Sequence, residues 1–154
     1  WSARESKSVV EIAAGEITVR VDKRSGAVSF WNRGNQLLLA ENAAEPRVIG
    51  EEGSWVFFDW DKKERIKAKG MLDTDFLDVT INARYISFGG KKHRMPLVLS
   101  NRGYGIAAAA KNTVLLCDIK TYGQYLYAEG ERQLDYYFIC GEKPENVITR
   151  YKGL

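Results

Sequence analysis

The only histidine of the chain, His93, is the residue type most suited to acid–base catalysis, and it lies in a basic run, Lys91-Lys92-His93-Arg94. A serine or cysteine nucleophile needs a histidine base that a third group orients. Because neighbouring positive charge disfavours the protonated imidazole, a histidine among three cations is a poor general base. Together with the two distant cysteines, Cys117 and Cys140, it cannot complete a four-ligand zinc site. We therefore expect no catalytic residue and no metal site.

Aspartates form two groups, Asp59 with Asp61 and, further on, Asp73 with Asp75 and Asp78. Such carboxylates could pair for acid–base work or bind calcium through their oxygen atoms. The calcium-loop pattern, with its glycine and distal glutamate, is not met. The alternative that we favour is that they keep turns and strand edges in water.

Two further patterns could bind ligands. Gly103-Tyr104-Gly105 leads into a strand and opens no helix, so the geometry of a dinucleotide site is missing and we expect no cofactor. Aromatic side chains could stack on sugar rings, although filling the core is their commoner use. The candidates are Trp55, Trp60, Tyr125 and Tyr127.

The charge and hydropathy of the chain exclude several classes of partner. Its 23 basic and 20 acidic residues give a net charge of +3, with the signs interleaved, so we expect no nucleic-acid partner. No stretch approaches the roughly 18 apolar residues of a membrane span. No charged-then-apolar leader opens the given sequence, and its first residue is Trp1, so we expect either that a leader or tag has been removed or that the chain is a piece of a longer one. Cys117 and Cys140 each lie in an apolar run, which favours reduced thiols and a cytoplasmic location, with a disulfide between adjacent strands as the alternative.

The elements that would position these residues are β-strands. Residues 16–22 alternate strictly, with Ile17, Val19 and Val21 on one face, which is typical of a strand with one wet side. Gly26 follows in a turn that favours positive φ. Further strands are expected at 27–32, 36–40, 54–60, 76–81, 84–88, 96–100, 105–110, 113–118, 122–128 and 134–140. This spacing predicts a single all-β domain over 1–154, built as an antiparallel sandwich or barrel.

One helix is expected at the end of the chain. Pro144 suits a first helical turn, and Glu145 would lie near the positive end of the helix dipole. Val147, Ile148 and Tyr151 follow at spacings of three to four residues. We expect a short C-terminal helix here.

Three segments, in order, resemble the N-terminal domain of the family 31 glycoside hydrolases, the α-glucosidase and α-xylosidase family. Residues 134–141, LDYYFICG, with the helix from Pro144, resemble the family's DYYF-x-x-G strand and the helix that leads into its catalytic barrel. Residues 95–106, MPLVLSNRGYGI, are similar to its strand-turn-strand with S-x-R-G-Y-G. Residues 18–41 look like its opening hairpin.

The resemblance implies a β-sandwich of the galactose-mutarotase-like type. It also implies that a (β/α)-barrel carrying two catalytic aspartates follows Leu154, so that this chain holds neither catalytic residue of a retaining α-glycosidase. The barrel would be the partner of the sandwich, and an oligosaccharide or α-glycoside the substrate. In the family the sandwich lends a loop to the rim of the sugar pocket. By position, the rim residues here would be Phe88, Lys91 and His93.

The sequence departs from the family at one turn. Where the family carries G-L-G-E or G-L-G-Q after an aromatic strand, this chain has Ala68-Lys69-Gly70-Met71. The parent is therefore either an active enzyme or a divergent, inactive one. Two other functions stay open: a free-standing carbohydrate-binding sandwich, suggested by the aromatic content, and a purely structural interaction domain.

Overall fold

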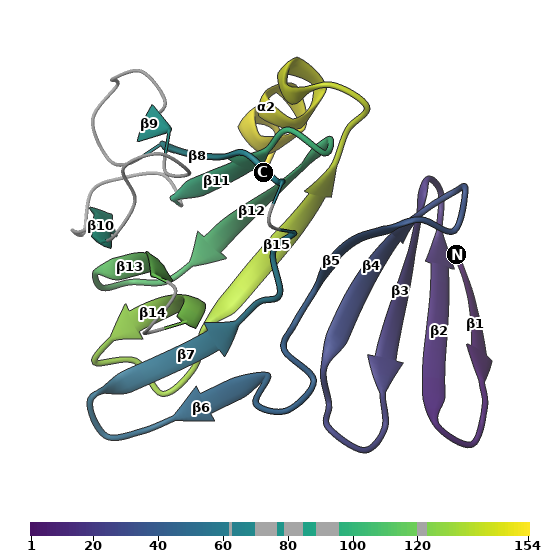
Figure 1. The fold of residues 1–154 in the computed structure, drawn as a ribbon, viewed down its shortest axis with the longest axis horizontal. Coiled ribbons are helices and arrows are strands. Elements are labelled where there is room, and N and C mark those ends of the chain that lie inside the picture. The colour runs from purple at the N-terminus through teal and green to yellow at the C-terminus, as the bar shows by residue number, and fades with distance from the viewer. Residues whose placement is uncertain (62, 70–76, 79–84, 89–95, 120–122) are drawn as a thin grey trace.

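The computed structural model of the chain describes residues 1–61, 63–69, 77–78, 85–88, 96–119 and 123–154. Within these ranges the chain forms three antiparallel sheets of five strands each and a C-terminal helix (Figure 1). The predicted all-β sandwich with a short terminal helix is therefore confirmed.

The first sheet, which we call the N-terminal sheet, is a simple meander in which each strand pairs with the next. Hairpins form it because alternating apolar residues are separated by residues that accept positive φ, Gly26 at 75° and Asn35 at 57°. Its strands are β1 (Ser2–Glu5), β2 (Val9–Ala14), β3 (Ile17–Asp22), β4 (Val28–Asn32) and β5 (Leu37–Ala40).

The other two sheets mix strands from distant parts of the chain. The middle sheet has the order β10-β13-β14-β7-β6. Its strands are β6 (Arg47–Ile49), β7 (Gly53–Phe57), β10 (Tyr85–Phe88), β13 (Val114–Ile119) and β14 (Gly123–Glu129). The third sheet, which we call the helix-side sheet, has the order β15-β12-β11-β8-β9. Its strands are β8 (Ile66–Lys69), β9 (Leu77–Asp78), β11 (Leu97–Ser100), β12 (Tyr104–Ala109) and β15 (Asp135–Cys140).

One apolar core joins the three sheets. Phe30 of the N-terminal sheet stacks on Phe138 of the helix-side sheet with ring centroids 4.0 Å apart, and Leu126 of the middle sheet is buried in the same cluster. Burying a side chain of this size stabilises the fold by about 1.5–3 kcal/mol. The strands cannot slip by one residue without turning these side chains out into water.

The helix-side sheet is covered on its second face by α2 (Pro144–Lys152), as Figure 1 shows near β11, β12 and β15. Leu97, Leu99, Ala107 and Ile139 form a second apolar cluster with the fully buried Val147 of the helix. Pro144 begins the helix and Glu145 lies in its first turn, as predicted.

Glycines allow the helix to approach the sheet closely. A β-carbon at Gly105 would lie 2.7 Å from Cγ1 of Val147. Gly103 has φ of 80°, and a β-carbon there would lie 2.3 Å from the carbonyl oxygen of Gly141. The Gly141 N–H donates to the Gly103 carbonyl at 2.8 Å, which holds the two turns together.

Alternation in the sequence located most of the strands, with small shifts at their ends, but it missed four of them: β1, β2, β6 and β8. The predicted strand 54–60 ends at Phe57, so Asp59, Trp60 and Asp61 lie beyond it. The turn expected over Ala68-Lys69-Gly70-Met71 is wrong for its first half, because Ala68 and Lys69 pair with Val98 and Leu97 of β11. Gly70 and Met71 lie outside the described residues.

Replacing Gly103 tests the close approach of the two turns. We expect Gly103→Ala to lower the free energy of unfolding by more than about 2 kcal/mol, because the methyl group meets the Gly141 carbonyl in a left-handed backbone. The matched control is Gly15→Ala, since Gly15 has φ of 62° and nothing within 4 Å of the added atom. The control should cost roughly 1 kcal/mol. Equal losses in urea unfolding would contradict this packing.

Candidate functional site

The predicted rim residues are only partly described. Phe88 ends β10, where it pairs with Val114 at the start of β13. Lys91 and His93 lie outside the described residues. The structure therefore places the start of the predicted rim loop at one edge of the middle sheet.

Two of the candidate aspartates, Asp59 and Asp61, lie in the described part of the chain with their side chains, and both make local hydrogen bonds. Asp59 and Asp61 are exposed, as expected for residues that keep a surface wet. Asp59 Oδ1 accepts a hydrogen bond from Asn42 at 2.9 Å, and Asp61 Oδ1 accepts one from the backbone of Lys63 at 2.8 Å. Asp73 and Asp75, like the side chain of Asp78, lie outside what the structure describes.

The aromatic candidates pack against one another. Trp60 and Tyr125 are buried. Trp55 stacks on Tyr127 with ring centroids 4.5 Å apart. Packing within the fold is thus their main use, and the half-buried Trp55–Tyr127 pair keeps part of its surface open.

Cys117 is buried in the middle sheet and Cys140 is half-buried in the helix-side sheet; both are free thiols. The alternative of a disulfide between adjacent strands is therefore wrong. Among the described residues, no three histidine, cysteine or acidic side chains lie close enough to hold a metal ion. In the same part of the chain, no helix is long and apolar enough to cross a membrane.

A buried carboxylate, Glu64, organises the turn between β11 and β12. Its side chain is 1% exposed and receives hydrogen bonds from the Tyr104 hydroxyl and, at 2.5 Å, from Ser100 Oγ. Arg102 lies 3.7 Å from its second oxygen and also donates to the Leu37 carbonyl of β5. The Glu64 cluster therefore links the helix-side sheet to the N-terminal sheet.

A second buried carboxylate, Glu41, has the same type of partners. Its fully buried side chain accepts hydrogen bonds from the Tyr136 hydroxyl at 2.6 Å, from Arg47 at 2.7 Å and from the Val28 N–H at 3.0 Å. Val28 belongs to the N-terminal sheet, Arg47 to the middle sheet and Tyr136 to the helix-side sheet. The Glu41 cluster thus joins all three sheets.

The tyrosines of both clusters are held in their neutral form. Burial, and then the negative charge of Glu64, raises the pKa of the Tyr104 hydroxyl well above its ordinary value. Burial and the charge of Glu41 raise the pKa of Tyr136 in the same way. A neutral tyrosine hydroxyl can donate a hydrogen bond to the buried carboxylate, whereas a tyrosinate has no proton to donate.

These clusters explain the sequence motifs physically. In SNRGYG, Ser100, Arg102 and Tyr104 bind Glu64, and the two glycines fit the turn beside Gly141 and the helix. In DYYFICG, Tyr136 binds Glu41. The motif residues are thus committed to structure. Each of these buried carboxylates is held by several donors, which fits a structural role.

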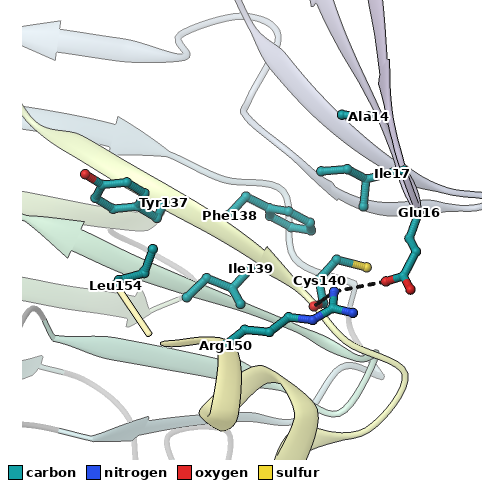
Figure 2. A pocket seen from close by; sticks show the side chains of 10 residues that line it. Ala14, Glu16, Ile17, Tyr137, Phe138, Ile139, Cys140, Arg150 and Leu154 are labelled. Carbon is teal, nitrogen blue, oxygen red and sulfur yellow. Dashed lines mark hydrogen bonds and ion pairs between the residues drawn. The ribbon is translucent and has the colours of Figure 1, made fainter. Parts of the chain in front are cut away.

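An open hollow of about 510 Å³ lies between the β2–β3 turn and the end of the chain (Figure 2). Ile17 lines one wall, and Tyr137, Ile139 and Leu154 line the other. Tyr137 is 48% exposed, and Leu154, the last residue given, is 61% exposed.

One ion pair crosses this hollow. Arg150 donates to Glu16 at 2.9 Å and to the Cys140 carbonyl at 2.7 Å, as the dashed lines in Figure 2 show. The hydrogen bond from Arg150 lowers the pKa of the Glu16 carboxyl. Burial, with the charge of Glu16, raises the pKa of the Cys140 thiol, so this cysteine is a weak nucleophile. The hollow can therefore receive an apolar surface, but its described residues offer no nucleophile–base pair.

Sequence analysis did not find Glu41, Glu64 or Arg150, which make the main polar contacts of the molecule. The one available signal for Glu41 was its position directly after the apolar run 37–40, and the sequence around Glu64 carries no such signal. Neither distance along the chain nor residue type reveals that such a glutamate is buried.

The fold occurs within larger solved enzymes. A GH31 dextranase of Flavobacterium johnsoniae, complexed with isomaltotriose, matches 99% of this chain over 20% of its own, with a TM-score of 0.81 and 17% identity. The cycloalternan-forming enzyme of Listeria monocytogenes, in complex with a pentasaccharide substrate, matches 99% over 16% of its own, with a TM-score of 0.79 and 13% identity. A GH31 α-xylosidase of Xanthomonas citri matches 77% over 14%, with a TM-score of 0.63 and 18% identity.

This chain therefore spans a fifth or less of each of these three enzymes. At these identities the likeness is one of fold, and it confirms at that level the resemblance that the motifs indicated. No protein-family model and no curated protein matches the sequence.

Replacing Tyr136 tests the Glu41 cluster. We expect Tyr136→Phe to lower the free energy of unfolding by about 1.5–3 kcal/mol, because a buried carboxylate loses a donor. The control, Tyr137→Phe, changes the neighbouring exposed tyrosine and should stay within about 0.5 kcal/mol. Similar losses for both variants in urea unfolding would contradict the assignment.

The raised pKa values predict a delayed alkaline titration. The hydroxyl of an unfolded tyrosine ionises at about pH 10. Because the folded values of Tyr104 and Tyr136 lie higher, the stability that they contribute is fully present below that pH and is lost as the pH rises above it. We expect tyrosinate absorbance from at least two tyrosines to develop only together with loss of the circular dichroism of the sheets. Complete titration of all tyrosines in the folded chain would contradict this.

Proposed function

We propose that this chain is the non-catalytic N-terminal sandwich domain of a family 31 α-glycosidase, in the cytoplasm, and forms a single domain over 1–154. It packs on the catalytic barrel and contributes the loop after Phe88, with Lys91 and His93, to the rim of the sugar pocket. The parent acts on an oligosaccharide or α-glycoside by retaining hydrolysis.

The observation that carries this proposal is the coincidence of fold and motif. Nearly the whole chain matches a small part of a GH31 dextranase. Several of the residues that made the sequence resemble this family, Tyr104, Tyr136 and Gly105 among them, bind the buried carboxylates or fit the helix to its sheet. Residues with such interior roles support common ancestry more strongly than a shared strand order does.

The surface around α2 supports a domain that packs on another. Tyr137, which is 48% exposed, lies beside the open hollow, whose lining also includes Ile17 and Ile139. Exposed apolar area of this kind marks surfaces that associate with other proteins or domains. The barrel is the partner we propose for this face.

A free-standing carbohydrate-binding module is the second candidate. The open part of the Trp55–Tyr127 pair favours it, because aromatic faces bind sugar rings. It predicts that the isolated chain binds oligosaccharides and that the complete gene product has no hydrolase activity.

The test is an assay of the complete gene product on aryl α-glucoside and aryl α-xyloside. We expect hydrolysis of at least one, with retention of the anomeric configuration. Lys91→Ala and His93→Ala should raise the KM for an oligosaccharide by about three- to tenfold, the equivalent of one hydrogen bond.

The control is Lys111→Ala, which removes an exposed lysine from a turn between β12 and β13. Its KM should be unchanged. A complete gene product that lacks a barrel would refute the domain assignment, and a barrel that hydrolyses neither glycoside would indicate an inactive parent.

A further inference from the structure

A groove of about 680 Å³ lies at the end of the middle sheet where β7 ends and β14 begins. Its polar lining includes Asp59, Asp61 and Asp118, and its apolar lining includes Phe57 and Ile119. It is separate from the hollow beside α2, with which it shares no lining residue.

Backbone hydrogen bonds fix the walls of this groove. The N–H of Phe58 donates to the Gln124 carbonyl at 2.8 Å, and that of Trp60 donates to the Gln124 side chain at 3.1 Å. The Asp59 N–H donates to the Ala40 carbonyl of β5 at 2.9 Å. The segment after β7 is thus tied to two sheets and holds its side chains in place.

Two carboxylates of the groove are oriented by amides. Asn42 Nδ2 donates to Asp59 Oδ1 at 2.9 Å, and Gln124 Nε2 donates to Asp118 Oδ1 at 2.8 Å. The Asn42 amide is itself fixed, because its oxygen accepts two backbone N–H groups at 3.0 Å. As far as the described residues show, the Oδ2 atoms of Asp59 and Asp118 accept no hydrogen bond. They are pre-positioned acceptors.

The chemistry of the lining selects the class of ligand. The described lining contains no lysine, arginine or histidine. Among the described residues, no three histidine, cysteine or acidic side chains converge in the groove. Trp60 also lines the groove, but it is 6% exposed and its indole interacts with the Tyr104 hydroxyl, so it contributes mainly apolar surface. The ligand must therefore supply several hydrogen-bond donors around a compact body that also has apolar faces.

We infer that this groove binds a neutral oligosaccharide through one or two pyranose rings. Ring hydroxyls donate to Asp59 and Asp118, and the apolar C–H face of a ring lies against Phe57. The choice of ligand class rests on the proposed function. The site itself lies at the Asp118 end of β13, whereas Phe88, where the predicted rim loop begins, pairs at the opposite end of that strand.

Calorimetric titration of the 154-residue chain with isomaltotriose and with maltotriose tests this inference. We expect saturable binding of at least one, with a Kd on the order of 1 mM. Asp118→Asn keeps the shape of the side chain and the hydrogen bond from Gln124 but replaces the Oδ2 acceptor with an NH2 group. We expect it to weaken binding about tenfold, and we expect the same of Asp59→Asn.

The matched control is Asp135→Asn. Asp135 also accepts hydrogen bonds from a glutamine amide, that of Gln133, but it lies on β15 and does not line the groove. Its affinity should equal that of the unchanged chain. Circular dichroism verifies that each variant folds. If one groove variant fails to fold, the other can still be compared with the control.

Three outcomes would overturn the inference. The first is no saturable heat with either sugar up to about 50 mM. The second is equal weakening in Asp135→Asn. The third is binding of a polyamine such as spermidine, but of neither sugar, with an affinity that falls with salt, which would assign the groove to a cationic ligand. This experiment measures sugar binding by the chain itself and not hydrolysis. Failure of the proposed function, seen as a complete gene product without hydrolase activity, is therefore distinct from failure of this inference.

Discussion

Two carboxylates, Glu41 and Glu64, lie buried in a fold whose core consists mostly of apolar side chains. An ionised carboxylate loses several kcal/mol of hydration on burial, which only well-placed donors can offset. Each glutamate therefore requires its tyrosine and its arginine, and the structure supplies both. The donors of Glu41 come from all three sheets, and Arg102 of the Glu64 cluster also donates to the N-terminal sheet, so satisfying the carboxylates helps to fix how the sheets lie relative to one another.

The motifs that resemble family 31 enzymes follow from this constraint. Tyr104 and Tyr136 lie on β12 and β15, adjacent strands of the helix-side sheet, and each reaches one carboxylate. Gly105 keeps α2 close to the same sheet. A domain whose recognisable residues maintain its interior suits a supporting role, and its ligand contacts are left to loops and grooves at its surface.

The sequence predicted what depends on local pattern. Strict alternation located β3, and Pro144 located the start of α2. It missed β6, which has only three residues with two of them exposed, and β8, because its last two residues, Ala68 and Lys69, fall in the turn that the sequence predicts. The groove at Asp118 could not be predicted, because its walls join residues 42, 59, 118 and 124, brought together only by the pairing of distant strands.

The most direct test of this account is a double-mutant cycle between Glu64 and Tyr104, with Glu64→Gln, Tyr104→Phe and the pair measured by urea unfolding. If the buried carboxylate and the motif tyrosine stabilise the fold together, their coupling free energy should exceed about 1 kcal/mol. Losses that add to within about 0.5 kcal/mol would show that the two side chains act independently, and would contradict the claim that the motif exists to satisfy this carboxylate.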